Sequence, residues 1–138
     1  MATLRTAAQL TEHLHRAFPG KDTEARMSVE ALEDARIVVR MRVDAGDLRP
    51  GATLSGPTVF ALADASAWLL TLAHLEEGRD AVTSSVTINY LRRPALADLL
   101  AEARLLKLGR RLSVCDVLIS SDGSPDPVAQ ATVSYAPV

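Results

Sequence analysis

The sequence predicts an α+β fold in which an antiparallel β-sheet curves around one long buried α-helix. Residues 57–73 form an apolar run in which Asp64 is the single charged residue, as expected of a helix that is buried on nearly every side. Strand-like segments joined by short turns precede and follow this run, and strands linked in this way pair antiparallel. A helix with so much apolar surface needs a sheet that curves around it to bury that surface.

Length, composition and charge indicate a single domain over residues 1–138. The chain is 48% hydrophobic and has a formal net charge of −2, which supports a core and argues against binding to nucleic acids or membranes. The single cysteine, Cys115, excludes an internal disulfide and a cysteine-based zinc site. The N-terminal residues lack the apolar segment of a secretory signal, so we expect a cytoplasmic protein.

The first element is a peripheral helix within residues 1–20. Apolar residues recur at helical spacing over residues 4–18, and Pro19-Gly20 closes the helix. His13 and His15 are two positions apart and point to different faces, so we expect solvated histidines and no shared metal.

Two strands and a loop connect this helix to the central one. Residues 26–32 and 35–43 have the composition of strands, with Glu33 and Asp34 in the turn between them. Residues 44–55 are rich in Gly, Pro and Asp, which predicts a loop.

The central helix is predicted to begin at Pro57 and to end between Glu77 and Gly78. Proline suits the first helical position, and glycine is common after a helix. A transmembrane span is the rival interpretation. It is disfavoured because the run is short and a mid-span Asp costs about 3 kcal/mol.

Four strands follow, over residues 81–91, 99–108, 111–120 and 128–135. Gly109 and residues 121–127 supply turns between them. In the first of these strands, alternation places five residues on one face: Val82, Ser84, Val86, Ile88 and Tyr90.

Asp64 is the leading candidate for chemistry. Its neighbours on the helix are small, and a buried carboxylate is costly unless it is paired, satisfied by backbone donors, or functional. A salt bridge to a later arginine is the structural alternative. Cys115 is expected to be a buried structural residue, and His74 a capping or solvated histidine.

Three segments carry a resemblance to a known family: residues 55–64 (SGPTVFALAD), 87–94 (TINYLRRP) and 106–111 (LKLGRR). With them, residues 44–136 resemble the hotdog-fold acyl-CoA thioesterases, specifically the phenylacetate-pathway (PaaI-type) branch. The resemblance implies a six-stranded antiparallel sheet around one long helix.

The resemblance also implies roles for particular residues. Asp64 would be the nucleophile or general base, and the Gly56 N–H would stabilise the oxyanion. Ser55 stands where the family has a catalytic His, and Thr83 or Ser84 falls at a polar position of the following strand. The reaction is acyl-CoA hydrolysis, which requires neither a cofactor nor a metal, because coenzyme A is part of the substrate.

The spacing of Gly56 and Asp64 predicts a site shared between subunits. The two residues are eight positions apart, about 12 Å along a helix, so both cannot reach one carbonyl group of one substrate. They must come from two chains. The resemblance implies a homodimer, paired further into a dimer of dimers, which is a homotetramer.

Candidate substrate-binding residues fall into two classes. Five basic residues at strand ends and in a turn could hold the phosphates of coenzyme A or be ordinary solvated side chains: Arg92, Arg93, Lys107, Arg110 and Arg111. Phe60 and Trp68 are either core residues or walls of an acyl pocket.

Two other functions remain open at this stage. The absence of the family's His favours a non-catalytic protein that binds acyl-CoA or an acyl carrier. A hydratase or dehydratase of the same fold would need a catalytic His beside the central helix, and His74 lies near the end of that helix.

Overall fold

The computed structural model of the chain describes residues 2–49 and 53–138. Its helices are α1 (Ala7–Ala17), α2 (Asp22–Ala25) and α3 (Gly56–Ala73), with a 3₁₀ turn at Ala45–Asp47. Its strands are β1 (Met27–Glu33), β2 (Arg36–Met41), β3 (Leu48–Arg49), β4 (Thr53–Leu54), β5 (Ala81–Tyr90), β6 (Leu99–Leu108), β7 (Ser113–Ser121) and β8 (Pro127–Pro137). The predicted order of a helix, two strands, a long helix and four strands is confirmed.

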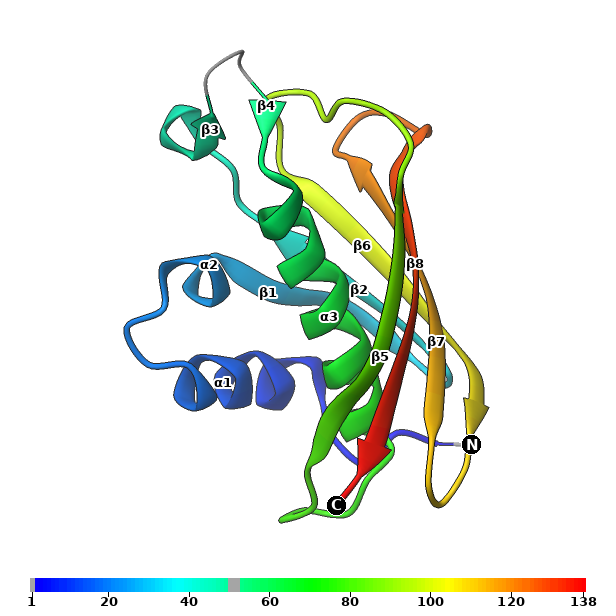
Figure 1. The fold of residues 1–138 in the computed structure, drawn as a ribbon. Helices are drawn as coiled ribbons and strands as arrows, with labels where there is room; N and C mark the ends of the chain where they lie inside the picture. The colour runs from blue at the N-terminus through cyan, green and yellow to red at the C-terminus, as the bar shows by residue number, and fades with distance from the viewer. Residues whose placement is uncertain (1, 50–52) are drawn as a thin grey trace.

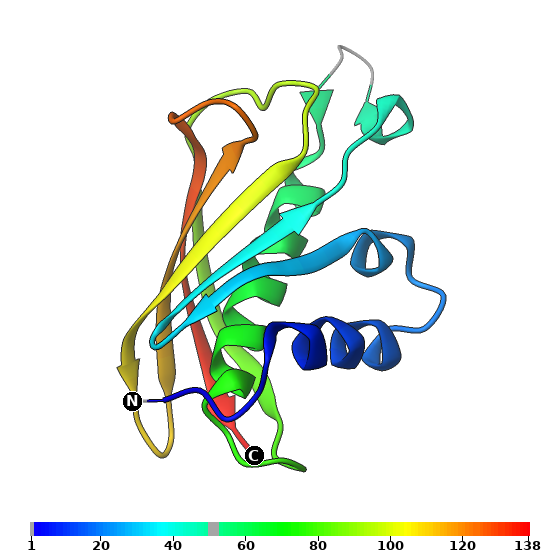
Figure 2. The same ribbon diagram turned by 180° about the vertical axis from the view of Figure 1, so that it is seen from behind.

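One antiparallel sheet wraps around α3. Its six strands lie in the order β1-β2-β6-β7-β8-β5, so β1 and β5 are the two edges. Figures 1 and 2 show the sheet curving from β1 past the middle strands to β5, with α3 in its concave face. The curvature lets one sheet cover several sides of the same helix, as the apolar run required.

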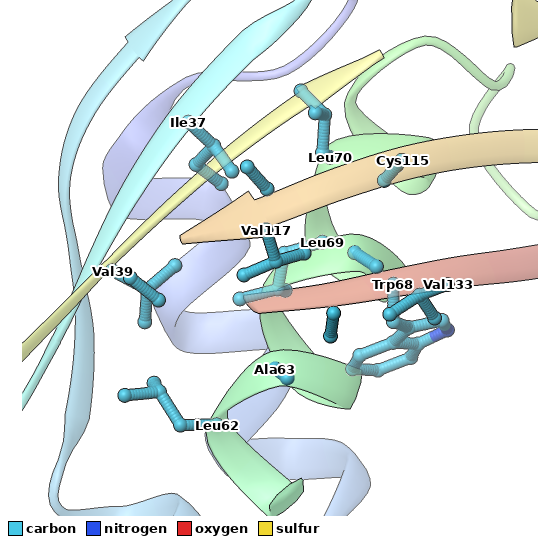
Figure 3. Close-up of a cluster of buried hydrophobic side chains, with 14 of the residues drawn as sticks. Ile37, Val39, Leu62, Ala63, Trp68, Leu69, Leu70, Cys115, Val117 and Val133 are labelled. Carbon is cyan, nitrogen blue, oxygen red and sulfur yellow. The ribbon is translucent and has the colours of Figure 1, made fainter. Parts of the chain in front are cut away.

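The core lies between α3 and the concave face of the sheet. Figure 3 shows Leu62, Leu69 and Leu70 of the helix together with side chains of the sheet, among them Val39 of β2, Val117 of β7 and Val133 of β8. Most of these side chains are fully buried, and truncating a buried leucine to alanine costs about 2–5 kcal/mol. Although α3 is long and apolar enough to span a membrane, 61% of it is buried inside this fold.

Helix α3 begins at Gly56, one residue before the predicted Pro57, and ends at Ala73, earlier than the predicted Glu77. The Ser55 hydroxyl caps the start by accepting from the Thr58 N–H. At the other end His74 leaves the helical conformation, and its N–H bonds to carbonyls in the last turn. Its side chain is buried, with Nδ1 3.1 Å from the Leu70 carbonyl oxygen and Nε2 3.5 Å from the Ala35 N–H. The expectation of a capping histidine is confirmed, while that of a solvated one is wrong.

Strand β5 contains an irregularity that the alternation rule missed. Thr83 pairs with Tyr135, but the next pair is Ser85 with Ser134, so one residue bulges out of the ladder. Because of the bulge, Val86, Ile88 and Tyr90 share a face of the strand with Thr83. Simple alternation had predicted that they share a face with Val82 and Ser84. It is this shift that aims Thr83 at α3.

The N-terminal part covers the open side of α3. Helix α1 is held by a capping box at Thr6, and its Leu10 and Leu14 are fully buried against β1 and α3. His15 is exposed, as expected, with Nε2 2.9 Å from the Met27 carbonyl oxygen, whereas His13 is half-buried and its ring lies 5.5 Å from that of Trp68. The short helix α2 and the β3-β4 hairpin were not predicted from the sequence.

Candidate functional site

The carboxylate of Asp64 is held by two hydroxyl groups from the sheet. The Tyr135 hydroxyl donates to Asp64 Oδ1 at 2.5 Å, and the Thr83 hydroxyl donates to the same oxygen at 3.1 Å. Thr83 lies on β5 and Tyr135 on β8, and the two residues are paired directly in the sheet. Adjacent strands thus present both donors to the middle of α3.

These partners explain how a carboxylate is kept in an apolar helix. Within residues 2–49 and 53–138, Asp64 makes no salt bridge, so the arginine pairing considered from the sequence is wrong for this part of the chain. Burial, and next the bond to Asp64, raise the pKa of the Tyr135 phenol far above its usual value. Tyr135 therefore remains a hydrogen-bond donor at any physiological pH.

A hollow of about 450 Å³ opens beside the carboxylate, and we call it the Asp64 hollow. Its walls include Ala61, Ala65, Phe18, Trp68, Val82 and Asp80. The small residues of α3 leave the space, while Phe18 and Trp68 meet edge to face at a centroid distance of 5.7 Å. This arrangement can accept an apolar group next to a half-buried carboxylate.

The N-terminus of α3 lies beside a second, smaller hollow. Gly56 is the first helical residue, so its N–H has no acceptor within the helix. The Gly56 hollow has a volume of about 210 Å³, and Gly56, Tyr90, Arg92 and Arg93 are among its lining residues. The Tyr90 hydroxyl donates to the Gly56 carbonyl oxygen at 2.8 Å, fixing the end of β5 against the helix start.

The two hollows are separate within one chain. Asp64 lines only the larger of them and Gly56 only the smaller, among the residues described. Because α3 is continuous from Gly56 to Ala73, the two groups stand about 12 Å apart along its axis. One chain therefore does not bring both to the same substrate atom.

The predicted basic residues divide into two groups. Arg92 and Arg93 follow β5 and line the Gly56 hollow, where Arg92 also donates to the Pro127 carbonyl group. The other three are exposed and lie around the β6-β7 turn, at the opposite end of the sheet in Figure 1: Lys107, Arg110 and Arg111. Only the first group lies beside a predicted catalytic residue.

The remaining candidates differ in their proximity to Asp64. Trp68 lines the Asp64 hollow and its indole N–H donates to Asp80 at 3.0 Å, whereas Phe60 is half-buried and lines neither hollow. Ser84 is exposed at the bulge, next to Thr83. The Ser55 hydroxyl is engaged in capping α3, 2.8 Å from the Thr58 hydroxyl.

Cys115, on β7, is the only cysteine of the chain. Cys115 is buried at 1% exposure, as expected, and burial raises the pKa of its thiol to about 11. Across residues 2–49 and 53–138 there is no group of three or more His, Cys, Asp or Glu side chains suited to a metal ion.

Sequence reasoning missed Tyr135. The residue stands in a predicted strand, and a tyrosine near a chain end carries no local sign of function. Its partner Asp64 is 71 positions away, and only the pairing of β8 with β5 brings them together. The site of Asp64, Thr83 and Tyr135 is thus a product of sheet topology.

Comparison with solved structures places this fold among thioesterases. The chain is 41% identical to a candidate thioesterase from Silicibacter sp. TM1040, over 100% of this chain and 95% of that one, with a TM-score of 0.91. A Pseudomonas aeruginosa thioesterase is 23% identical over 98% and 95% of the two chains, with a TM-score of 0.85. Zebrafish thioesterase superfamily member 2 is 24% identical over 99% of both chains, with a TM-score of 0.82. The last two comparisons show a shared fold.

The sequence comparisons identify the family. No curated protein sequence gives a significant match to the chain. The sequence profile of the thioesterase superfamily matches residues 51–127, which include the whole of α3 and strands β5, β6 and β7. With the structural likeness above, this match confirms the hotdog fold expected from the sequence. The chain belongs to the thioesterase superfamily.

Proposed function

We propose that the protein is an acyl-CoA thioesterase of the phenylacetate-pathway type in which Asp64 is the catalytic residue. The observation that carries the proposal is the half-buried Asp64 carboxylate, which opens onto a partly apolar hollow and has one oxygen anchored by hydroxyl donors. A thioester presents an apolar acyl group next to an electrophilic carbonyl carbon. The Asp64 hollow offers space for the acyl group, and Asp64 offers a nucleophile or base for the reaction at the carbonyl carbon.

Two routes of hydrolysis fit this placement. In the first, Asp64 attacks the thioester carbonyl, the coenzyme A thiolate leaves, and water hydrolyses the resulting anhydride. In the second, Asp64 takes a proton from a water molecule that attacks the carbonyl carbon, and the C–S bond then breaks to release the coenzyme A thiolate and the carboxylic acid. Both routes place negative charge on the carbonyl oxygen, and the N–H of a helix start is suited to stabilise that charge.

The donor to this oxygen is proposed to come from a second subunit. Strand β5 is a ten-residue sheet edge, and its end residues Val82 and Tyr90 are 52% and 53% exposed. Such an edge is a template for pairing with another chain. Thr83 and Asp64 lie near one end of β5, and Tyr90 and Gly56 near the other. Antiparallel pairing of β5 with its copy would therefore bring Asp64 to the partner's Gly56.

The same arrangement suggests where coenzyme A binds. Arg92 and Arg93 lie beside Gly56, so in the paired molecule they would flank the thioester from the partner's side. Guanidinium groups suit phosphate. We also propose that two such dimers pair into a tetramer and that the protein resides in the cytoplasm.

A non-catalytic acyl-CoA binding protein is the second candidate. It is favoured by Ser55, which occupies the position of the family's His and whose hydroxyl is engaged with Thr58. A hydratase or dehydratase is not supported, because His74 is buried at the far end of α3.

Asp64→Asn separates the thioesterase from the binding protein. Asn keeps an oxygen that accepts from Tyr135 and Thr83 but lacks the negative charge, so we expect hydrolysis of an acyl-CoA panel to fall about 100-fold or more. Because the acceptor is retained, the change in unfolding free energy should stay near 1 kcal/mol, a few degrees in Tm.

The control is Asp116→Asn, which removes a carboxylate that accepts from Gln130 on the sheet and does not line either hollow. Thiol release and acyl-CoA binding by calorimetry are measured on both variants and wild type. Hydrolysis by Asp64→Asn at the wild-type rate would refute the role of Asp64. Tight binding without hydrolysis in the wild type would favour the binding protein.

A further inference from the structure

Tyr135 makes the shortest contact to the Asp64 carboxylate among the residues described. Its side chain is 4% exposed, and its hydroxyl lies 2.5 Å from Asp64 Oδ1 and 3.1 Å from the Asp64 carbonyl oxygen. Tyr135 sits in β8, between β7 and β5, and pairs with Ser113 on one side and Thr83 on the other. Its ring is therefore held by three strands.

The two oxygens of the Asp64 carboxylate differ in their hydrogen bonding. Tyr135 and Thr83 both donate to Oδ1, whereas the described residues provide no hydrogen bond to Oδ2. A carboxylate with one oxygen anchored cannot rotate freely about its terminal bond. The unanchored oxygen is then left for a ligand in the Asp64 hollow.

We infer that Tyr135 is a positioning residue, which anchors Asp64 Oδ1 so that the ionised Oδ2 is presented to the substrate. The inference rests on the proposed function, because it assigns Tyr135 a part in the same reaction. Tyr135 itself does not transfer a proton, since burial and the adjacent carboxylate keep its phenol protonated.

The charged surroundings show what Tyr135 counteracts. Glu24 and Asp80 also line the Asp64 hollow, from α2 and from the start of β5, and both would disfavour a further negative charge. His13 of α1 stacks on Trp68 at the same hollow, and burial and nearby arginines lower its pKa, so it is neutral near pH 7. The Cys115 thiol on β7 is likewise neutral. Hydrogen bonds to Oδ1 are thus the described interactions that favour ionised Asp64.

Tyr135→Phe tests the inference by removing one hydroxyl from a buried ring. Loss of a hydrogen bond to the carboxylate should change the shielding of the Asp64 carboxyl carbon, so its ¹³C signal should move at constant pH. The signal is followed by NMR in protein labelled with ¹³C at the aspartate carboxyl carbons, with Asp64→Asn used to assign it.

The matched control is Ser113→Ala. It also deletes a buried hydroxyl, the one 3.0 Å from Thr71, on the strand next to Tyr135, but it does not contact Asp64. We expect Ser113→Ala to leave the Asp64 carboxyl signal in place. An Asp64 signal that does not move in Tyr135→Phe, or that moves equally in both variants, would overturn the inference.

Kinetics supply a second readout. In Tyr135→Phe we expect kcat to fall about tenfold with little change in KM, and Ser113→Ala to leave both values close to those of the wild type. An equal loss of kcat in the two variants would mean a purely structural role and would refute the inference.

Two further measurements keep the test decisive. If Tyr135→Phe does not fold, the ¹³Cζ signal of Tyr135 is compared between the wild type and Asp64→Asn instead, and it should move when the charge of its acceptor is removed. Absence of that change would count against the inference. If the wild type hydrolyses no thioester, the proposed function fails, while the NMR comparison still decides whether Tyr135 anchors Asp64.

Discussion

Replacing Gly56 with proline removes the proposed oxyanion donor at a position that tolerates the change. Gly56 is the first residue of α3, where the helix does not use the backbone N–H that proline lacks. Ser55 has φ −73° and ψ 150°, the extended conformation that a following proline requires. The substitution thus deletes one N–H without redirecting the chain.

The expected loss can be worked out from this geometry. A single oxyanion donor is worth about 3 kcal/mol, so kcat should fall about 100-fold or more. Packing should change little, because a Cβ at position 56 would lie 3.4 Å from the nearest atoms of Tyr90. The Tyr90 hydroxyl keeps its acceptor, the carbonyl oxygen of residue 56. A residue with a Cβ before Pro57 is disfavoured in the helical conformation, and this cost is shared by Gly56→Ala, so the two variants should have similar Tm values.

Gly56→Ala is the matched variant, since it adds the same Cβ and retains the N–H. Thiol release from acyl-CoA substrates, KM and Tm are measured for both variants and for wild type. The kcat of the proline variant is compared with that of the alanine variant, so that any effect of the added carbon cancels.

Equal kcat in the two variants, with both melting as the wild type does, would refute the assignment of the Gly56 N–H. A loss shared by both would place the effect in the contact with Tyr90. Only a loss confined to proline supports the donor.

Three other predictions concern assembly, substrate binding and stability. Light scattering during assays should show that activity requires a dimer or larger assembly, and a fully active monomer would contradict the shared site. Arg92→Ala or Arg93→Ala should raise KM for coenzyme A thioesters more than Arg110→Ala does, because the first two line the Gly56 hollow; equal KM values would remove that distinction. The bond from Arg36 holds the pKa of Glu102 below its usual 4.5, so its stabilisation is complete above that pH and disappears as pH falls through the lowered pKa. Urea unfolding of Arg36→Ala should accordingly show a deficit at neutral pH that shrinks in acid, and a constant deficit would contradict it.

The order and type of the main elements could be predicted because local patterns encode them. Residues 99–108 were predicted as a strand with the bounds that the structure has, since apolar alternation ends at a turn glycine. The start of α3 could be predicted to within one residue from Pro57, because the preference of proline for the first turn of a helix is a local property. The lone acid in an apolar helix was likewise visible as a candidate site.

What the sequence did not reveal depends on contacts between distant segments. Helix α3 stops at Ala73 because His74 turns inward to carbonyl and amide groups, one of them at the β1-β2 turn. The bulge in β5 depends on pairing with β8 and decides which face carries Thr83.

The surroundings of Asp64 were therefore decided by tertiary structure. The sequence by itself determined that a carboxylate would lie in the middle of the buried helix, because hydrophobic periodicity is a local property. It could not determine that the partner would be Tyr135, because strand register joins residues that have no relation along the chain. A hydroxyl on β8 reaches this carboxylate only once the sheet has closed around α3.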